Sequence, residues 1–315
     1  MKIAFAATMA LLLILPAGLS AQGVVITSPE PWATLRTDSV VVSFQADTSI
    51  LPRGSVDFRV VRSSRGRETT LFTQNVKAAD LGAEVFLGRV RANDIPLGGT
   101  DFMSIMWSIP GSDLRGSIKP IGIAKLSGEA IGGKWIPAYP PLSAVRIADG
   151  ASMEEAAAAF TEATGFEVGG MRVAVGWNTE AFFINLPSPP SGVTEVEFAL
   201  DLRCGKNAFL AWADRFVVYD AASSVVSLLR YERSVSGAIG YKSVPWGGGA
   251  AFSFMKGESA NLVKIFWHEM GIQPFDERGL GFAVFVGGRA GQPANYPAGA
   301  RRDIPGTWGD IRLEK

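Results

Sequence analysis

Few side chains in this sequence could carry out acid–base or nucleophilic chemistry. His268 is the only histidine, so a Ser-His-acid triad would have to include it, and the G-x-S-x-G turn that presents a serine nucleophile in α/β-hydrolases is absent. The pair His268-Glu269 also lacks the H-E-x-x-H spacing that places two imidazoles on one zinc ion. The sequence therefore predicts no histidine-based catalytic site.

Paired carboxylates are the other chemistry to consider, because glycoside hydrolysis needs two of them roughly 5 to 10 Å apart. The candidates are Glu195, Glu197, Asp201 and Asp214. Glu195 and Glu197 are two residues apart, so they share one face of a strand, and a solvated strand face is the preferred interpretation. No D-x-D-x-D loop for calcium occurs. We expect no enzyme activity and no cofactor, and we leave metal binding unassigned.

The first residues have the pattern of a secretory signal peptide. One lysine precedes an apolar core, which is followed by Pro16 and the small residues Ser20 and Ala21. The core is shorter than the roughly 20 residues that a spanning helix needs. We expect cleavage near Ala21, no transmembrane segment, and a mature protein in the periplasm or outside the cell. The only cysteine, Cys204, excludes an intrachain disulfide.

The composition argues against nucleic acid as a partner. Lysine plus arginine and aspartate plus glutamate number 30 each, which leaves no net positive field. The 36 glycines and 18 prolines suit many short strands joined by turns. The length of 315 residues allows two domains.

The first domain, residues 22–126, is predicted as a seven-stranded sandwich of the immunoglobulin or fibronectin type III kind. Turn residues separate most of its apolar segments, and Trp107 is predicted to be a core residue. The seven segments begin at Val24, Val40, Val56, Thr69, Ala83, Phe102 and Lys119.

A Gly/Pro-rich stretch at 127–142 is predicted as a linker, and a second antiparallel β-sandwich follows at 143–315. Its one peripheral helix should begin after Ser152, which forms a capping box with Glu155, and end at Gly165. The predicted strands that follow are MRVAVGW, AFFINL, TEVEFALDL, FLAWADRFVVYD, SVVSLLRYE, GAIGYKSV, AAFSFM, LVKIFW, LGFAVFV and WGDIRLEK. The chain as a whole is therefore predicted to be all-β.

Five of these segments carry a family resemblance through their order. They are MRVAVGWNTEAFFINLPSPP, VTEVEFALDL, LVKIFWHEMGIQP, LGFAVFV and IPGTWGDIRLEK. In this order they resemble the carbohydrate-binding module family 9-like domain, over roughly Gly170 to Lys315. The resemblance implies a sugar held between two aromatic side chains, but the matching positions are Ser191 and Arg301 or Arg302. The family's aromatic pair is therefore missing here.

Other aromatic residues of the second domain could supply a platform for the C–H face of a pyranose. The carbohydrate-binding candidates are Trp212, Trp246 and Tyr296, with Arg215, Arg302 and Asp303 as polar companions. The alternative places Trp212 in the core, makes Trp246 a turn anchor and leaves the arginines solvated. Trp177, Trp267 and Trp308 are predicted to be core residues.

The leading prediction is a secreted, non-catalytic protein that binds a polysaccharide or glycan. The alternative is a structural or protein-interaction module of the cell envelope whose sugar site has been lost, with other envelope proteins as partners. A third hypothesis follows from the resemblance, because relatives of this fold bind haem through Met or His, and Met270 lies two residues after His268. No C-x-x-C-H motif accompanies that pair.

Overall fold

The computed structural model describes residues 24–46, 54–80, 84–96, 98, 100–123, 141–161, 164–203, 207–236, 238–258, 260–274, 279–288 and 294–313. The predicted signal peptide, Cys204 and all of the predicted linker except 141–142 lie outside these residues. Within them, the chain is almost entirely β-structure, so the all-β prediction is confirmed. No helix of the described residues is long and apolar enough to cross a membrane.

The N-terminal strands form two facing sheets. One has the order β1-β3-β6 and the other β2-β8-β7-β4-β5. The seven predicted strands are all present, and the short β2 is an addition. The bounds are β1 (Val24–Ser28), β2 (Thr34–Leu35), β3 (Ser39–Ala46), β4 (Ser55–Ser64), β5 (Arg67–Lys77), β6 (Val85–Arg89), β7 (Phe102–Ser108) and β8 (Arg115–Ile123), with single 3-10 turns at Ala78–Asp80 and Ala92–Asp94.

Buried and exposed side chains alternate along β4, which shows how this sandwich forms its core. Val56, Phe58 and Val60 are buried, whereas Asp57 and Arg59 between them are exposed, as expected where one face of a strand packs on a core. Trp107 on β7 is 6% exposed and belongs to the same core, which confirms its predicted role.

The C-terminal strands form one sheet of 13 strands, in the order β16-β15-β14-β13-β19-β21-β9-β11-β12-β18-β17, with β10 beside β11 and β20 beside β19. The bounds are β9 (Leu142–Arg146), α1 (Met153–Ala158), β10 (Phe166–Val168), β11 (Met171–Trp177), β12 (Ala181–Pro187), β13 (Val193–Asp201), β14 (Asp214–Asp220), β15 (Val225–Ser236), β16 (Ala238–Pro245), β17 (Phe252–Lys256), β18 (Ala260–Phe266), α2 (Trp267–Met270), β19 (Gly279–Gly288), β20 (Ala294–Tyr296) and β21 (Gly309–Leu313), with a 3-10 turn at Pro305–Thr307.

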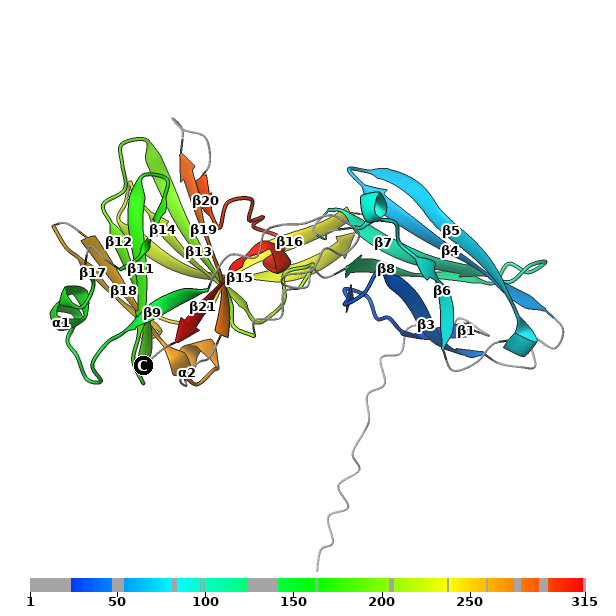
Figure 1. Cartoon of the computed structure of the whole chain (residues 1–315), viewed down its shortest axis with the longest axis horizontal. Coiled ribbons are helices and arrows are strands. Elements are labelled where there is room, and N and C mark those ends of the chain that lie inside the picture. Colours follow the sequence, from blue (N-terminus) through cyan, green and yellow to red (C-terminus); the bar gives the residue numbers. More distant parts are fainter. Residues whose placement is uncertain are drawn as a thin grey trace, which may run out of the picture.

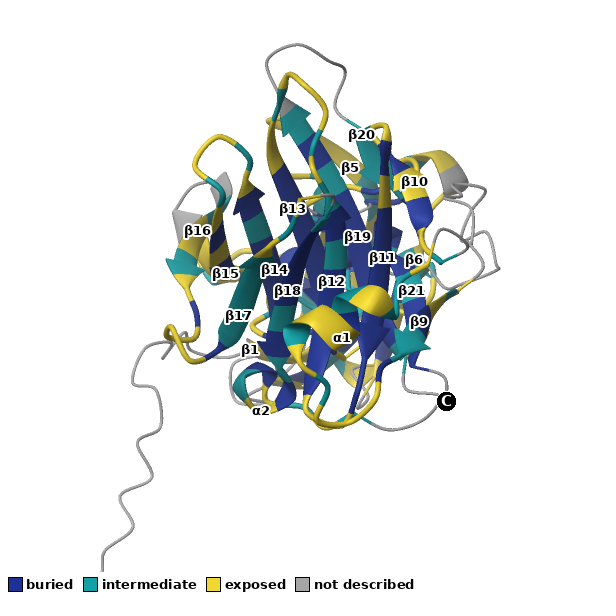
Figure 2. Ribbon diagram, turned by 90° about the vertical axis from the view of Figure 1, so that its left-hand side faces the viewer, coloured by how far each residue is buried: buried dark blue, intermediate teal, exposed yellow. Residues whose placement is uncertain are grey.

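This sheet curls so that its two halves enclose one core (Figure 1). It is antiparallel except at β9, which runs parallel to both β11 and β21 and thereby joins the two halves. Most residues of the central strands are buried (Figure 2). Trp177, Trp267 and Trp308 are 4%, 2% and 3% exposed, which confirms the prediction that they are core residues.

β13 shows that both faces of this sheet are covered. Val196, Phe198 and Leu200 point into the enclosed core, while Ala199 belongs to a second apolar cluster on the outer face, and Glu197 and Asp201 beside it are also buried. The outer face is therefore packed rather than solvated. The segments that cover it include the candidate residues.

The structure has a second short helix, α2, besides the one predicted, and the boundaries beside both helices differ from the prediction. The capping box of Ser152 and Glu155 is present, but α1 ends at Ala158 rather than at Gly165. The Thr161 carbonyl accepts from the N–H and the hydroxyl of Thr164. β18 ends at Phe266, so Trp267, the last residue of the predicted strand LVKIFW, belongs to α2.

Candidate functional site

The loop between β13 and β14 carries the most solvent-exposed large apolar side chain among the described residues. Trp212 is 65% exposed. The Arg203 guanidinium lies 4.5 Å from the centre of the indole ring, within the range of a cation–π contact. Trp212 was predicted to lie on a strand, but β14 begins only at Asp214. The alternative that placed it in the core is also wrong.

Two buried aspartates hold the ends of this loop. Asp201 and Asp214 face each other across β13 and β14, and each is 1% exposed. Oδ1 of Asp201 accepts from the Arg203 N–H at 3.1 Å, and Oδ2 of Asp214 accepts from the Ala211 N–H at 2.6 Å. On the next strand a Cβ at Gly281 would lie 2.8 Å from the Cβ of Asp201, so only glycine leaves room for this pair.

The pKa of Asp214 is raised well above its ordinary value, first because the carboxyl is buried and then because Asp201 repels its charge. The N–H of Ala211 and the arginines Arg233 and Arg215 offset this only in part. Oδ1 of Asp214 is buried without a hydrogen-bond partner. The loop is therefore anchored by a carboxyl group that resists ionisation.

Arg215 is buried beneath the loop. Its guanidinium donates to the carbonyl oxygens of Trp212 at 2.5 Å and Asp214 at 3.2 Å, and lies 5.1 Å from the ring centre of Trp246. Burial, followed by repulsion from Arg230, lowers its pKa. Arg215 therefore fixes the backbone that carries Trp212 and is not one of the solvated arginines of the alternative interpretation.

Trp246 and Tyr296 do not join Trp212 in a cleft. Trp246 is 7% exposed and belongs to the enclosed core. Tyr296 is half-buried and stacks on Phe166, with 4.1 Å between the ring centres. Trp246 is therefore a core residue and not the sugar contact that was predicted, and of the three candidate rings only Trp212 is exposed as a platform.

Arg302 lies farther along the outer face and holds Glu197. Its Nε and Nη2 donate to the two carboxylate oxygens of Glu197 at 2.5 Å, and Nη2 also donates to the hydroxyl of Tyr231. Burial raises the pKa of Glu197, and Arg302 counteracts this. The solvated-face interpretation of Glu197 is therefore wrong. Asp303 is 3.7 Å from Arg301 and makes a surface ion pair.

His268 and Met270 point in different directions. The His268 side chain is 72% exposed, whereas Met270 is 3% exposed and packs in the core, so the two do not present ligands to one side. No group of three histidine, cysteine, aspartate or glutamate side chains capable of holding a metal ion occurs in the described part of the chain.

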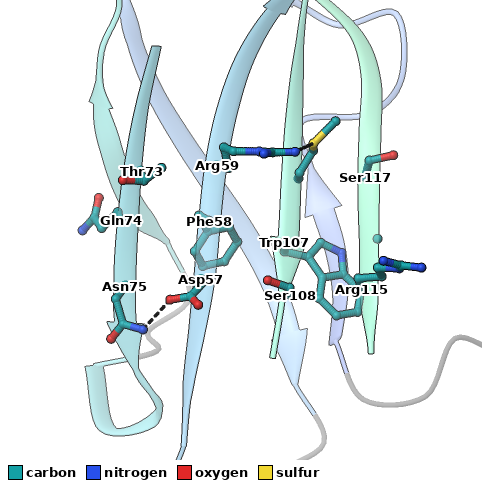
Figure 3. A pocket seen from close by; sticks show the side chains of 12 residues that line it. Asp57, Phe58, Arg59, Thr73, Gln74, Asn75, Trp107, Ser108, Arg115 and Ser117 are labelled. Atoms are coloured by element: carbon teal, nitrogen blue, oxygen red, sulfur yellow. Dashed lines mark hydrogen bonds between the residues drawn. The ribbon is translucent and has the colours of Figure 1, made fainter. Parts of the chain in front are cut away.

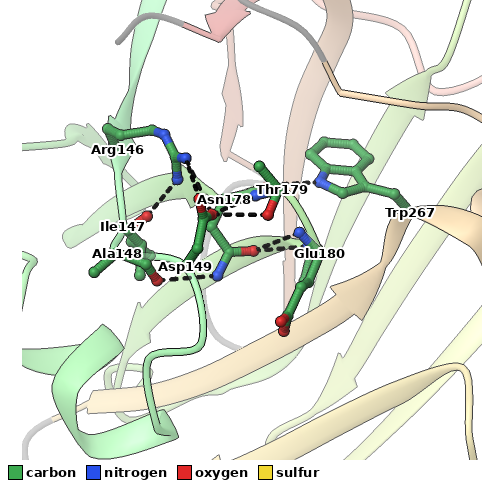
Figure 4. Close-up of polar contacts among 9 residues, drawn as sticks. Arg146, Ile147, Ala148, Asp149, Asn178, Thr179, Glu180 and Trp267 are labelled. Carbon is green, nitrogen blue, oxygen red and sulfur yellow. Dashed lines mark hydrogen bonds and ion pairs between the residues drawn. The ribbon is translucent and has the colours of Figure 1, made fainter.

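A depression of about 820 Å³ lies beside α2 and is lined by Glu180, Phe266, His268 and Gln273, among others. The hairpin next to it is fixed by polar contacts (Figure 4). The Trp267 indole donates to the Asn178 carbonyl at 2.8 Å, and Thr179 donates to Asp149 through its N–H and its hydroxyl, both at 2.9 Å. These hydrogen bonds pair the polar groups around the turn with one another and stabilise it.

A second depression, of about 780 Å³, lies on the N-terminal sandwich over β5, β4, β7 and β8 (Figure 3). Its exposed residues include Asp57, Arg59 and Arg115. Asn75 donates to Asp57 at 2.5 Å, and the guanidinium of Arg59 lies 3.0 Å from the sulfur of Met106. The large rings lining it, Phe58 and Trp107, are buried. This is the polar outer face of a sheet.

Comparison with known proteins gives only distant likenesses. No family model matches the sequence, and no curated protein matches it. Among solved structures, a carbohydrate-binding module family 9 domain from Caldicellulosiruptor kristjanssonii in complex with cellotriose is 14% identical with a TM-score of 0.33, covering 48% of this chain and 77% of that one. The same kind of domain from that organism in complex with glucose is 13% identical with a TM-score of 0.33, covering 55% and 83%. A likeness this remote says nothing about a ligand.

The sequence analysis did not identify Arg203 as the neighbour of Trp212, nor Asp201 as a residue that anchors the loop. The sequence does contain a pattern that indicates such an anchored loop. The segment from Asp201 to Asp214 begins and ends with an acid, and it contains an arginine, a lysine and an asparagine before the apolar run that includes Trp212. Acids at both ends of a loop are typical of side chains that accept hydrogen bonds from their own backbone.

Proposed function

We propose that this chain is a secreted, non-catalytic glycan-binding protein that uses Trp212 as its stacking platform. The single observation that carries the proposal is the 65% exposure of an indole on an anchored loop. An exposed tryptophan face is suited to the apolar C–H face of a pyranose, and Arg203 beside it offers donors for sugar hydroxyls. Fixing the loop in advance lowers the ordering cost of binding.

The open setting of Trp212 favours a polymer as ligand. The other two candidate rings, Trp246 and Tyr296, pack elsewhere and do not form an aromatic sandwich with Trp212. One aromatic face gives a weak contact, which becomes useful when the ligand repeats along a chain or surface. The proposed ligand is therefore a polysaccharide, bound away from the family's aromatic positions.

The domain assignment forms part of this proposal. Residues 1–21 would be removed as a signal peptide, 22–126 would form an immunoglobulin or fibronectin type III-like spacer, 127–142 a linker, and 143–315 the family 9-like module. The strand orders β1-β3-β6 and β2-β8-β7-β4-β5 support the spacer assignment. Delivery beyond the cytoplasmic membrane would bring the module to envelope or extracellular polysaccharides.

The test is a pull-down with insoluble cellulose, xylan and chitin, supported by a glycan array. We expect wild type to bind at least one polysaccharide and Trp212→Ala to bind about 10-fold more weakly or worse, since burying an aromatic ring is worth roughly 1.5 to 3 kcal/mol. Phe86→Ala is the matched control, because Phe86 is also an exposed ring, at 52%, but lies on the first sandwich. Failure of wild type to bind any glycan would contradict the proposal.

The second candidate function is protein interaction in the cell envelope. It is favoured by the same exposed indole, since tryptophan and arginine are the residues most enriched at the energetic centres of protein interfaces. Its signature would be an envelope protein captured by wild type and lost with Trp212→Ala, without binding to any polysaccharide.

A further inference from the structure

The loop that carries Trp212 is seated on the N-terminal sandwich. Trp32, which precedes β2, meets Phe209 of this loop edge to face, with 5.3 Å between ring centres, and lies 6.1 Å from Tyr241 on β16. The guanidinium of Arg233 lies 5.0 Å from the ring centre of Trp32. Figure 1 shows β15 and β16 reaching across to β7 and β8. Trp32 is half-buried, and its ring contacts Phe209, Tyr241 and Arg233 of the C-terminal sheet and its loop.

The backbone of the loop also lies close to the N-terminal sandwich. The Ala208 N–H donates to the hydroxyl of Thr34 at 3.1 Å. A Cβ at Gly98 would lie 1.9 Å from the Ala208 carbonyl oxygen, and one at Gly122 would lie 2.3 Å from the Ala208 Cβ. Both positions exclude any side chain, so the first sandwich presents a surface shaped for this loop. Trp32 itself has a φ of 68°, which is unusual for a residue with a bulky side chain.

Consecutive loop residues are then held from both sides. Ala208 and Phe209 contact the first sandwich as described. The Leu210 carbonyl accepts from Nε of Arg233 at 2.6 Å, Ala211 donates to Asp214, and the Trp212 carbonyl accepts from Arg215. Arg233 links the two halves, because the same guanidinium contacts Trp32. Ala208, Phe209 and Leu210 are thus held by residues distant in the sequence, and the next two residues are held by Asp214 and Arg215, three positions farther along.

We infer that Trp32 is a positioning residue for the Trp212 platform, so that polysaccharide binding needs both sandwiches docked as a unit. This inference rests on the proposed function of Trp212. Trp32 does not touch the ligand. It fixes Phe209 and, through Arg233, the Leu210 carbonyl, and these set the direction in which the indole three residues later faces solvent. Removing the ring frees the loop and raises the cost of ordering it on the ligand.

The test compares Trp32→Ala, Trp32→Phe and the control Phe86→Ala in the full chain. We expect Trp32→Ala to weaken binding to the polysaccharide bound by wild type by about tenfold, the upper size of one aromatic pair, and Trp32→Phe to restore most of it. Small-angle scattering should show a larger maximum dimension for Trp32→Ala alone. Wild-type binding by Trp32→Ala would overturn the inference while leaving the Trp212 proposal standing.

A ligand-free measurement separates the two ideas. With 5-fluorotryptophan incorporated, the fluorine resonance of Trp212 is assigned by its loss in Trp212→Phe. We expect that resonance to shift and narrow in Trp32→Ala, as the loop gains motion, and to stay unchanged in Phe86→Ala. An unchanged Trp212 resonance in Trp32→Ala overturns the inference even if no glycan binds.

Discussion

Trp246 and Trp212 each lie against an arginine, yet they are placed in opposite environments. Trp246 is 7% exposed with Arg215 at 5.1 Å, and Trp212 is 65% exposed with Arg203 at 4.5 Å. Arg215 connects them, because it stacks on Trp246 and donates to the carbonyl of Trp212. Trp246 therefore stabilises the sheet, and through Arg215 the sheet holds the backbone from which Trp212 projects into solvent.

The largest effect on stability should come from Trp246. Trp246→Ala removes a buried indole and leaves the Arg215 guanidinium beside a cavity, so we expect a loss of about 3 to 5 kcal/mol in the free energy of unfolding. Urea denaturation followed by circular dichroism measures it. A loss below about 1 kcal/mol would mean that the site collapses around the cavity, and the contrast between the two tryptophans would not hold.

Neutralising Asp214 in the buried acid pair that it forms with Asp201 should change stability by an intermediate amount, and it should raise the free energy of unfolding instead of lowering it. The raised pKa of Asp214 means that folding binds a proton more tightly, so wild-type stability falls as pH rises from the unfolded value near 3.8 through the folded pKa. Asp214→Asn removes the charge and keeps an oxygen that can accept from Ala211. We expect it to be more stable than wild type by about 1 kcal/mol or more at pH 8.

The difference in the free energy of unfolding between wild type and Asp214→Asn should vanish below about pH 3.8. Below that pH the Asp214 carboxyl is protonated in both the folded and the unfolded chain. Measuring both proteins at each pH cancels the contributions of other titrating groups. A constant difference across the pH range would show that packing, and not the charge of Asp214, is responsible.

The sequence predicted the framework better than the site, and the reason is the range of the contacts. Strands such as β11 and β19 are specified by their own apolar residues, so alternation and apolar runs located them. The segment FLAWAD also reads as an apolar strand, but it forms a loop held by Asp214 and Arg233. Ala208, just before this segment, donates to Thr34 across 174 positions in the chain, and no local sequence pattern indicates such a pairing.

The smallest effect on stability should come from Trp212, and it completes the comparison. Trp212→Ala loses an exposed ring and a cation–π contact worth about 0.5 to 1 kcal/mol. The hydrogen bond that Arg215 donates to the backbone carbonyl of residue 212 and the one that the Ala211 N–H donates to Asp214 both remain. Urea denaturation should therefore place this variant within about 1 kcal/mol of wild type. Because Trp246→Ala is the opposite case, a Trp212→Ala protein as unstable as Trp246→Ala would mean that the exposed indole supports the fold. Loss of glycan binding by Trp212→Ala could then be attributed to unfolding, so near-native stability of this variant is the condition under which its binding defect identifies a ligand contact.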